Sequence, residues 1–299
     1  MKKAFLYIIV LAAACRLSAQ MLTSAATPLN ILAPQWKMGI TAEAAGEFAL
    51  PADISDGLDG DVGVYSASAN AKFQGAYNDR HFLTLSLGYS YWQYDFSSDN
   101  APFSSMNKTS ALAFYTGRIN ERWGAFAIAG ASFGSQVGES MWGGRTVAAG
   151  GGASYSFSPD LTVGLGGLAY SRLDNTWIGL PVGFIDWKIC DRLRLRTFSG
   201  AALFYDVFGD NSLVLNLTGE YCNSYYRLGE RAGNRRSVSD SYFQLSAGAA
   251  YNFSPRAYVG ACVGGNFGRE LDMRTNSRSA EEIEIDSAPF FGVRAGVSF

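Results

Sequence analysis

The chain has 299 residues and a formal net charge of −2, and only 17% of its residues are charged. Such a slightly acidic chain is not expected to bind nucleic acid, because phosphate recognition needs a basic surface. Aromatic residues reach 14% and glycines number 34, which favours a sheet protein. No apolar run of about 18 residues follows the N-terminus, so membrane-spanning helices are not expected.

The N-terminus has the pattern of a secretory signal peptide. Lys2 and Lys3 precede an apolar stretch over 4–14, and small residues precede a cleavage point before Gln20. Residues 1–19 are therefore expected to direct export and to be removed.

The exported part is expected to be one domain. Residues 20–35 form a short periplasmic N-terminal segment in this interpretation, and no linker or change in composition divides 36–299. Cys15 is an alternative site of lipidation, although a lipid would duplicate the anchoring of a barrel. The remaining cysteines lack the spacing of a disulfide framework or a zinc site; they are Cys190, Cys222 and Cys262.

Turn-type residues divide the chain into hairpins. Six short polar turns are expected at 78–80, 120–122, 158–160, 190–192, 209–211 and 254–256. Longer polar segments alternate with them at 51–61, 97–107, 136–144, 229–240 and 274–286. Short turns at one rim and long loops at the other are typical of a transmembrane, antiparallel, up-and-down β-barrel.

Apolar and small or polar residues alternate within the segments between the turns. The pattern is clearest over 83–91 and 243–253, where every second residue is apolar or aromatic. A strand with one apolar face has this period, in a soluble sandwich as well as in a barrel. Aromatic residues crowd the ends of the predicted strands, as at Tyr89 and Tyr91, which favours the interfacial bands of a membrane barrel.

The last strand alternates as far as the final residue. One face carries Phe291, Val293, Val297 and Phe299. An alternating strand with an aromatic carboxy-terminus resembles the signal by which the barrel assembly machinery of the outer membrane recognises its clients. We therefore expect that machinery to be a partner, and the bacterial outer membrane to be the location.

Parity sets the expected number of strands. If all six turns lie on the periplasmic side, they separate seven hairpins, which gives about 14 strands. The segment 193–208 is short for two strands, so it either bends near Ser199-Gly200 or forms one strand. We predict the bend and 14 strands, with 12 strands as the alternative.

A short part of the chain resembles a known family. The residues are Pro181-Val182-Gly183 through Trp187, then Arg192-Leu193-Arg194-Leu195 and Tyr205. They are similar to a family of outer-membrane barrels defined only as a domain of unknown function. The resemblance implies a barrel and carries no catalytic or binding residues.

Neither the single histidine nor the glycine runs predict a catalytic or nucleotide site. His81 adjoins the turn at 78–80, on the periplasmic side, whereas outer-membrane acyl hydrolases use a His/Ser pair at the outer rim. The glycines of 150–152 and 164–167 lack the strand–loop–helix context of a phosphate loop. We expect them to permit strand curvature and to make room for large neighbours.

The first predicted long loop is rich in carboxylates. Asp53, Asp56, Asp59 and Asp61 are weak candidates for a calcium site, since interleaved oxygen ligands suit a hard cation. Their spacing does not match an EF-hand, so a solvated loop is the preferred interpretation. No other metal site and no cofactor is predicted.

Charged side chains opposite apolar ones on a strand are expected to face the lumen, because charge is costly against lipid. These residues are Arg194, Arg196, Glu220 and Arg294. Whether they line a conducting pore or join a closed interior by salt bridges stays open. A separate basic segment could meet lipopolysaccharide phosphates, with ordinary rim charge as the simpler interpretation; it carries Arg227, Arg231, Arg235 and Arg236.

The leading functional hypothesis is a non-enzymatic, porin-like outer-membrane barrel that forms a channel or binds and transports a small solute. The alternative is a closed structural or adhesive barrel that acts through its extracellular loops. A lipid-modifying enzyme that depends on His81 is a third hypothesis. Outer-membrane lipid and lipopolysaccharide are the expected surroundings in each case.

Overall fold

The computed structural model describes residues 37–299 except 79, 174–175, 198–199, 232 and 277. The predicted signal peptide and the segment 20–35 lie outside the described residues, as does Cys15. The first strand begins at Lys37, next to the predicted start of the barrel domain.

The described residues form fifteen strands and one short 3-10 helix, η1. No helix among them is long and apolar enough to cross a membrane. In chain order the elements are β1 (Lys37–Asp56), β2 (Asp61–Tyr77), β3 (His81–Phe96), β4 (Ser105–Arg118), β5 (Trp123–Gln136), η1 (Met141–Gly144), β6 (Arg145–Ser158), β7 (Leu161–Ser171), β8 (Trp177–Cys190), β9 (Leu193–Thr197), β10 (Ala201–Asp206), β11 (Leu213–Arg231), β12 (Asn234–Ser254), β13 (Ala257–Thr275), β14 (Arg278–Ile285) and β15 (Ala288–Ser298).

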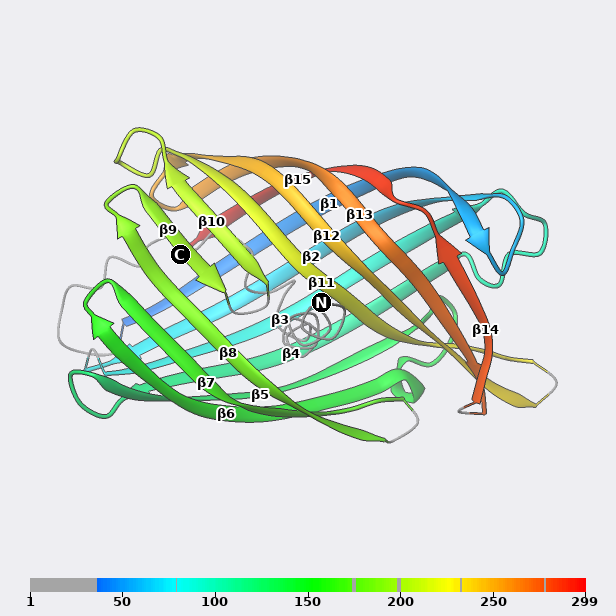
Figure 1. Cartoon of the computed structure of the whole chain (residues 1–299), viewed down its shortest axis with the longest axis horizontal. Helices are drawn as coiled ribbons and strands as arrows, with labels where there is room; N and C mark the ends of the chain where they lie inside the picture. The colour runs from blue at the N-terminus through cyan, green and yellow to red at the C-terminus, as the bar shows by residue number, and fades with distance from the viewer. Residues whose placement is uncertain (1–36, 79, 174–175, 198–199, 232, 277) are drawn as a thin grey trace, which may run out of the picture.

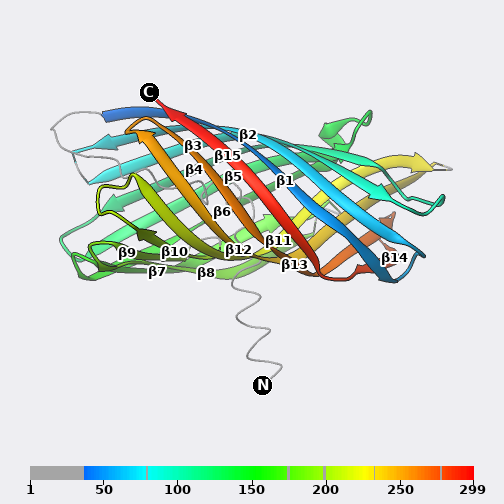
Figure 2. The same ribbon diagram turned by 90° about the horizontal axis from the view of Figure 1, so that it is seen from above.

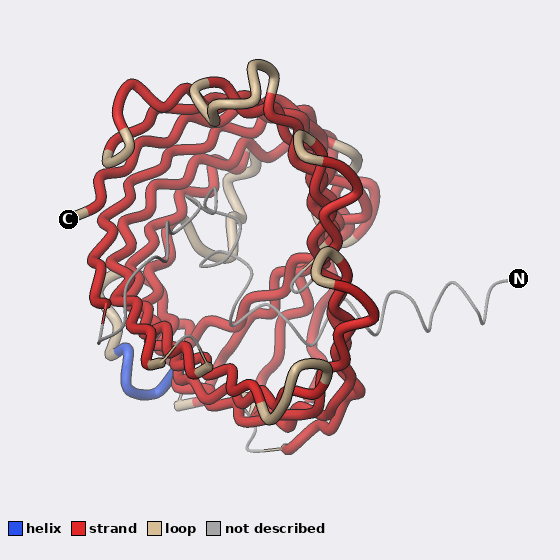
Figure 3. Tube along the Cα trace, turned by 90° about the vertical axis from the view of Figure 1, so that its left-hand side faces the viewer, coloured by secondary structure: helices blue, strands red, loops and turns tan. Residues whose placement is uncertain are grey.

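The strands close into one antiparallel barrel (Figures 1 and 3). Each strand from β1 to β13 pairs with its successor. The last place in the ring is shared by β14 and β15, which both pair with β13 on one side and β1 on the other. Figure 2 shows β15 between β1 and β13. The barrel therefore has 14 strand positions, which confirms the prediction, and the alternative of 12 strands is wrong.

The segment 193–208 contains two short strands, as predicted. β9 has 5 residues and β10 has 6, and they pair with each other from Leu193↔Tyr205 to Thr197↔Ala201. The connection between them includes 198–199, which lie outside the described residues. The hairpin ends midway along the barrel, while its neighbours β8 and β11 continue (Figure 1).

All six short turns lie at one end of the barrel, which we call the turn end. Their residue types match the backbone: Gly209 and Asn211 have φ values of 85° and 60°, and Asp206 accepts hydrogen bonds from both of their N–H groups. Phe299 is at this end too, where its N–H donates to the carbonyl of Ile40 at 2.8 Å. Of the turn at 78–80, residue 79 is outside the described residues.

The opposite end, which we call the loop end, differs from the prediction. Most of the predicted loops 51–61, 229–240 and 274–286 are strand, and the β11–β12 ladder runs as far as Arg231↔Asn234. The sequence interpretation ended these strands at their first run of polar side chains. Polar side chains do not end a hairpin whose backbone groups continue to find partners, so the strands extend further.

The outer surface is apolar, with an aromatic band towards each end. Leu85, Leu87, Leu217 and Val293 are exposed between the bands, as lipid-facing residues are. The band at the turn end includes Tyr77, Trp123, Phe157, Trp187, Tyr205, Phe253 and Phe299. The band towards the loop end includes Tyr65, Trp142, Trp177 and Phe267.

Apolar side chains pack together inside the loop-end half. Met106 of β4, Leu271 of β13 and Ile283 of β14 are 0% exposed. The same cluster contains Val62, Val64, Trp92, Tyr94, Phe103, Tyr226, Leu228, Val238, Met273, Ile285 and Phe290. Because its members come from both sides of the ring, this core fills the lumen at that level.

A buried ion pair borders the core. Arg269 Nη2 lies 2.6 Å from Asp240 Oδ2, its Nε lies 3.0 Å from Oδ1, and both side chains are 4% exposed. The hydroxyl of Tyr94 donates to the same carboxylate at 2.7 Å, and the ring of Tyr242 lies 4.7 Å from the guanidinium. Bidentate geometry and a third donor together offset the cost of removing both charges from water.

Replacing Arg269 by Met should therefore leave a buried, unpaired carboxylate. We expect the free energy of unfolding to fall by about 3–5 kcal/mol, measured by urea unfolding of the barrel in lipid vesicles. The matched control is Lys188→Met, which removes an exposed partner of Asp191 and should leave the stability unchanged. Equal, small effects of the two substitutions would contradict the role given to the buried pair.

Candidate functional site

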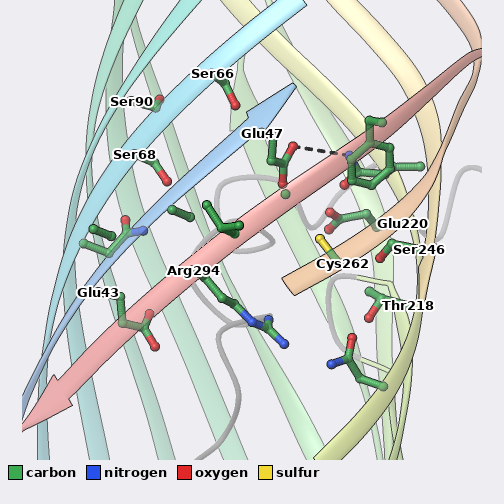
Figure 4. A pocket seen from close by; sticks show the side chains of 18 of the residues that line it. Glu43, Glu47, Ser66, Ser68, Ser90, Thr218, Glu220, Ser246, Cys262 and Arg294 are labelled. Carbon is green, nitrogen blue, oxygen red and sulfur yellow. Dashed lines mark hydrogen bonds between the residues drawn. The ribbon is translucent and has the colours of Figure 1, made fainter. Parts of the chain in front are cut away.

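The turn-end side of the core opens into a polar chamber within the barrel. Its volume is about 130 Å³. Figure 4 shows Glu47 of β1, Glu220 of β11 and Arg294 of β15 around the same space. Hydroxyl and amide groups of neighbouring strands complete the lining: Ser66, Ser68, Asn70, Ser90, Asn216, Thr218, Gln244 and Ser246. The strand period places these side chains on the inner face, since the residues that alternate with them face outward.

Carboxylates and cations are paired along one wall of the chamber. Lys72 Nζ lies 3.1 Å from Glu43 Oε2, and their side chains are 9% and 7% exposed. The hydroxyl of Tyr258 donates to Glu43 Oε1 at 2.7 Å. Gln244 Nε2 lies 3.5 Å from Glu47 Oε2. The lining of the chamber thus carries three carboxylates, with Glu220 the third, and one cation, Arg294, while Lys72 is paired with Glu43 from outside the lining.

The four charges predicted for the lumen occupy two places. Glu220 and Arg294 line the chamber. Arg194 and Arg196 lie on β9, where both face Asp186 of β8 at 2.7 Å and 3.6 Å. The structure therefore brings each pair to a distinct site, and the two arginines of β9 join an ion-pair network rather than the chamber.

Sequence reasoning missed Glu43, Glu47, Lys72 and Asp186. A signal for them existed, because Glu43 and Glu47 alternate with small or apolar residues along β1 in the same way that Arg294 does along β15. The rule that placed Arg294 inside would have placed them there as well.

The inner wall from β4 to β8 carries an apolar patch, beside the buried polar side chains of Lys108, Ser132 and Thr146. Leu112, Ile128, Ala148 and Leu168 are buried together, and they are packed against Phe114, Tyr170, Leu180 and Val182. This wall and the polar chamber give the lumen two chemically different sides.

The glycine runs belong to the same wall. A Cβ at Gly152 would meet the backbone of Leu165 and Gly166 on the neighbouring strand, and one at Gly164 would meet the ring of Phe184. Glycine is therefore required for close strand approach and for a large neighbour, as expected from the sequence.

The remaining sequence candidates lie at the rims. His81 is exposed at the start of β3, with Nδ1 2.6 Å from the hydroxyl of Tyr115. Asp53 pairs with Asp61 across the β1–β2 hairpin, and the Asp56 carboxylate accepts from the N–H of Gly57.

No cluster of three or more potential metal ligands occurs among the described residues, and the four aspartates do not converge. The three cysteines within the described ranges are free thiols.

The solved structures with similar folds are β-barrels of low sequence identity. A COG4313 outer membrane channel from Pseudomonas putida F1 is 15% identical, with a TM-score of 0.47 over 90% of this chain and 97% of that chain. The TodX monoaromatic hydrocarbon channel deltaS2 mutant is 8% identical, with a TM-score of 0.46 over 90% and 91%. A Pseudomonas aeruginosa FadL homologue is 12% identical, with a TM-score of 0.42 over 88% and 90%.

The fold thus resembles bacterial outer-membrane β-barrels, and at these scores the likeness says nothing about a solute. Comparison with curated proteins found no match. The family model described as "Domain of unknown function (DUF6268)" matches residues 54–293, which is most of the barrel. The chain therefore belongs to the DUF6268 family.

Proposed function

We propose that the protein is a non-enzymatic transport barrel of the bacterial outer membrane that binds a small amphipathic solute in its lumen. The observation that carries the proposal is the two-sided lumen. The strands β1–β3, β11–β13 and β15 supply hydrogen-bonding and charged groups, whereas β4–β8 supply an apolar patch. Apolar walls with a few placed polar groups are typical of small-molecule sites.

The charges of the chamber favour a cationic or hydrogen-bonding head group. Glu43 contacts Lys72 and Tyr258, and Glu47 contacts Gln244. Glu47 and Glu220 reach the chamber from different strands, β1 and β11. A solute with an ammonium or hydroxyl group next to a hydrocarbon body would match both sides of the lumen.

We further propose that the turn end faces the periplasm, with short turns inside and long hairpins outside. Phe291, Val293, Val297 and Phe299 are exposed on the outer face, which supports contact with lipid and with the assembly machinery. Contact of the loop end with lipopolysaccharide stays a proposal too. One basic residue of this end, Arg227, is paired with Glu230 at 2.9 Å.

Titration of the barrel in nanodiscs tests the proposed function. We expect a short alkylammonium salt to bind more tightly than an alkanol of the same length, and choline, which lacks the hydrocarbon body, not to bind. Replacing Glu47 or Glu220 by Gln should weaken alkylammonium binding about tenfold, since a charge-assisted hydrogen bond contributes roughly 1.5–3 kcal/mol. Isothermal calorimetry measures these affinities.

The matched control is Glu121→Gln, which removes an exposed carboxylate from a turn at the turn end and should leave the affinity unchanged. Absence of binding by both amphiphiles, or the same loss of affinity in the control, would overturn the proposal.

A closed structural or adhesive barrel is the second candidate, and the apolar core favours it. The core residues Met106, Leu271 and Ile283 have no solvent-exposed surface. We therefore expect the wild-type barrel to carry no steady ion current in a planar bilayer, and Leu271→Ser to admit water and raise the conductance.

A large steady conductance of the wild type would contradict closure by the core. A closed barrel that also fails to bind either amphiphile would support the structural candidate instead of the transport barrel. Leu217→Ser is the matched control. The Leu217 side chain is exposed on the outer surface, where we propose that it faces lipid, so its replacement should not alter the current.

A further inference from the structure

The wall of the barrel is interrupted beside the β9–β10 hairpin. β9 pairs with β8 only over Ile185–Cys190, and β10 pairs with β11 only up to Gly219. Beyond the hairpin, β8 continues over 177–184 and β11 over 220–226. Within the described ranges, no strand joins these two edges to each other (Figure 1).

A proline lies on the free edge of β8. The N–H of Ile185 points away from β7, because it donates to Thr197 Oγ1 at 2.9 Å. Strand alternation directs residue 181 to the same side, and this residue is Pro181, which has no N–H to leave unpaired. Together with β9 and β10, this edge contains the residues on which the family resemblance rests.

β11 leaves the line of the wall where the hairpin ends. Instead of meeting β8, it forms a parallel bridge with β5 at Arg227↔Ser135. A Cβ on Gly134 of β5 would meet the carbonyl of Tyr225, so the two backbones are in close contact. The outer face of β11 is thereby turned towards the inner wall of the neighbouring strands.

Side chains meet across the resulting space. The side chain of Tyr170, on the inner face of β7, interacts with that of Tyr225. The guanidinium of Arg172 lies 5.9 Å from the ring centre of Tyr225. We call the interval between the edges of β8 (177–184) and of β11 beyond Gly219, which are not paired with each other, the groove.

The β8 side of the groove is apolar and lies between the two aromatic bands. Its β8 wall carries Leu180, Val182 and Phe184, which are half-buried although they face inward. Trp187 and Trp177 mark the two aromatic bands on the same strand, and the free edge 177–184 lies between them. The bilayer itself is therefore the medium that adjoins the gap.

We propose that the groove between β8 and β11 is a lateral opening that admits the hydrocarbon chain of an amphipathic molecule dissolved in the bilayer. The chain lies along Val182 and Leu180, and the polar head faces Glu220, which is where β11 departs from β10. The inference rests on the proposed transport function, for which it supplies the route. An axial route is blocked by the core, whereas this one reaches the lumen without passing it.

Photo-crosslinking tests the opening directly. The full-length barrel is reconstituted in phosphatidylcholine vesicles with benzoylphenylalanine in place of Val182 or, in a second variant, Leu180. Leu165→benzoylphenylalanine is the positive control, because Leu165 of β7 is exposed on the outer face. Ser68→benzoylphenylalanine is the negative control, because Ser68 faces inward in the chamber. Retained resistance to denaturation in detergent shows that each variant is folded.

On irradiation we expect lipid adducts at Val182 and Leu180 in a yield comparable with Leu165, and no adduct at Ser68. Adducts at Leu165 alone would overturn the proposal, and so would equal adducts at Ser68, which would mean that lipid fills the lumen without selection.

The outcome of the crosslinking is independent of the calorimetric titration. Lipid adducts without amphiphile binding would retain the groove and reject the transport function, and binding without adducts would do the reverse.

Discussion

The pairing of strand backbone groups around a closed ring underlies the rest of this structure. A closed ring of antiparallel strands leaves no sheet edge wherever each strand has a partner on both sides, and the described strands form such a ring. The ring closes because β14 and β15 together return to β1, with Phe48↔Phe291 in register. Among the described residues, the ladder is interrupted between β8 and β11, and there the barrel differs from a simple cylinder.

The inward turn of β11 links that interruption to the closed interior. By pairing with β5 at Arg227↔Ser135, β11 narrows the loop-end half, and Tyr226 and Leu228 become part of the core. The short β9–β10 hairpin makes this possible, since a longer hairpin would keep β11 in the wall. The filled lumen and the interrupted strand ladder thus have the same structural cause.

Local sequence features predicted much of the architecture. The turn at 209–211 carries residues suited to positive φ, and the face Phe291, Val293, Val297 and Phe299 is exposed as its alternation indicated. The loop-end boundaries were placed wrongly, because polar side chains of the β11–β12 hairpin were taken as loop whereas backbone pairing continues to Arg231. The candidate site was predicted only in part, since Arg294 and Glu220 line the chamber but Glu43, Glu47 and Lys72 were overlooked.

The sequence by itself predicted an export signal, the positions of the turns and the face of many strand residues, because these depend on residues that are neighbours along the chain. Only the tertiary structure decided that the lumen is filled at one end and polar at the other, and that the strand ladder is interrupted on one side. Those properties arise from contacts between distant segments, such as Arg269 with Tyr94 or Tyr170 with Tyr225, and strand period contains no information about which distant faces meet.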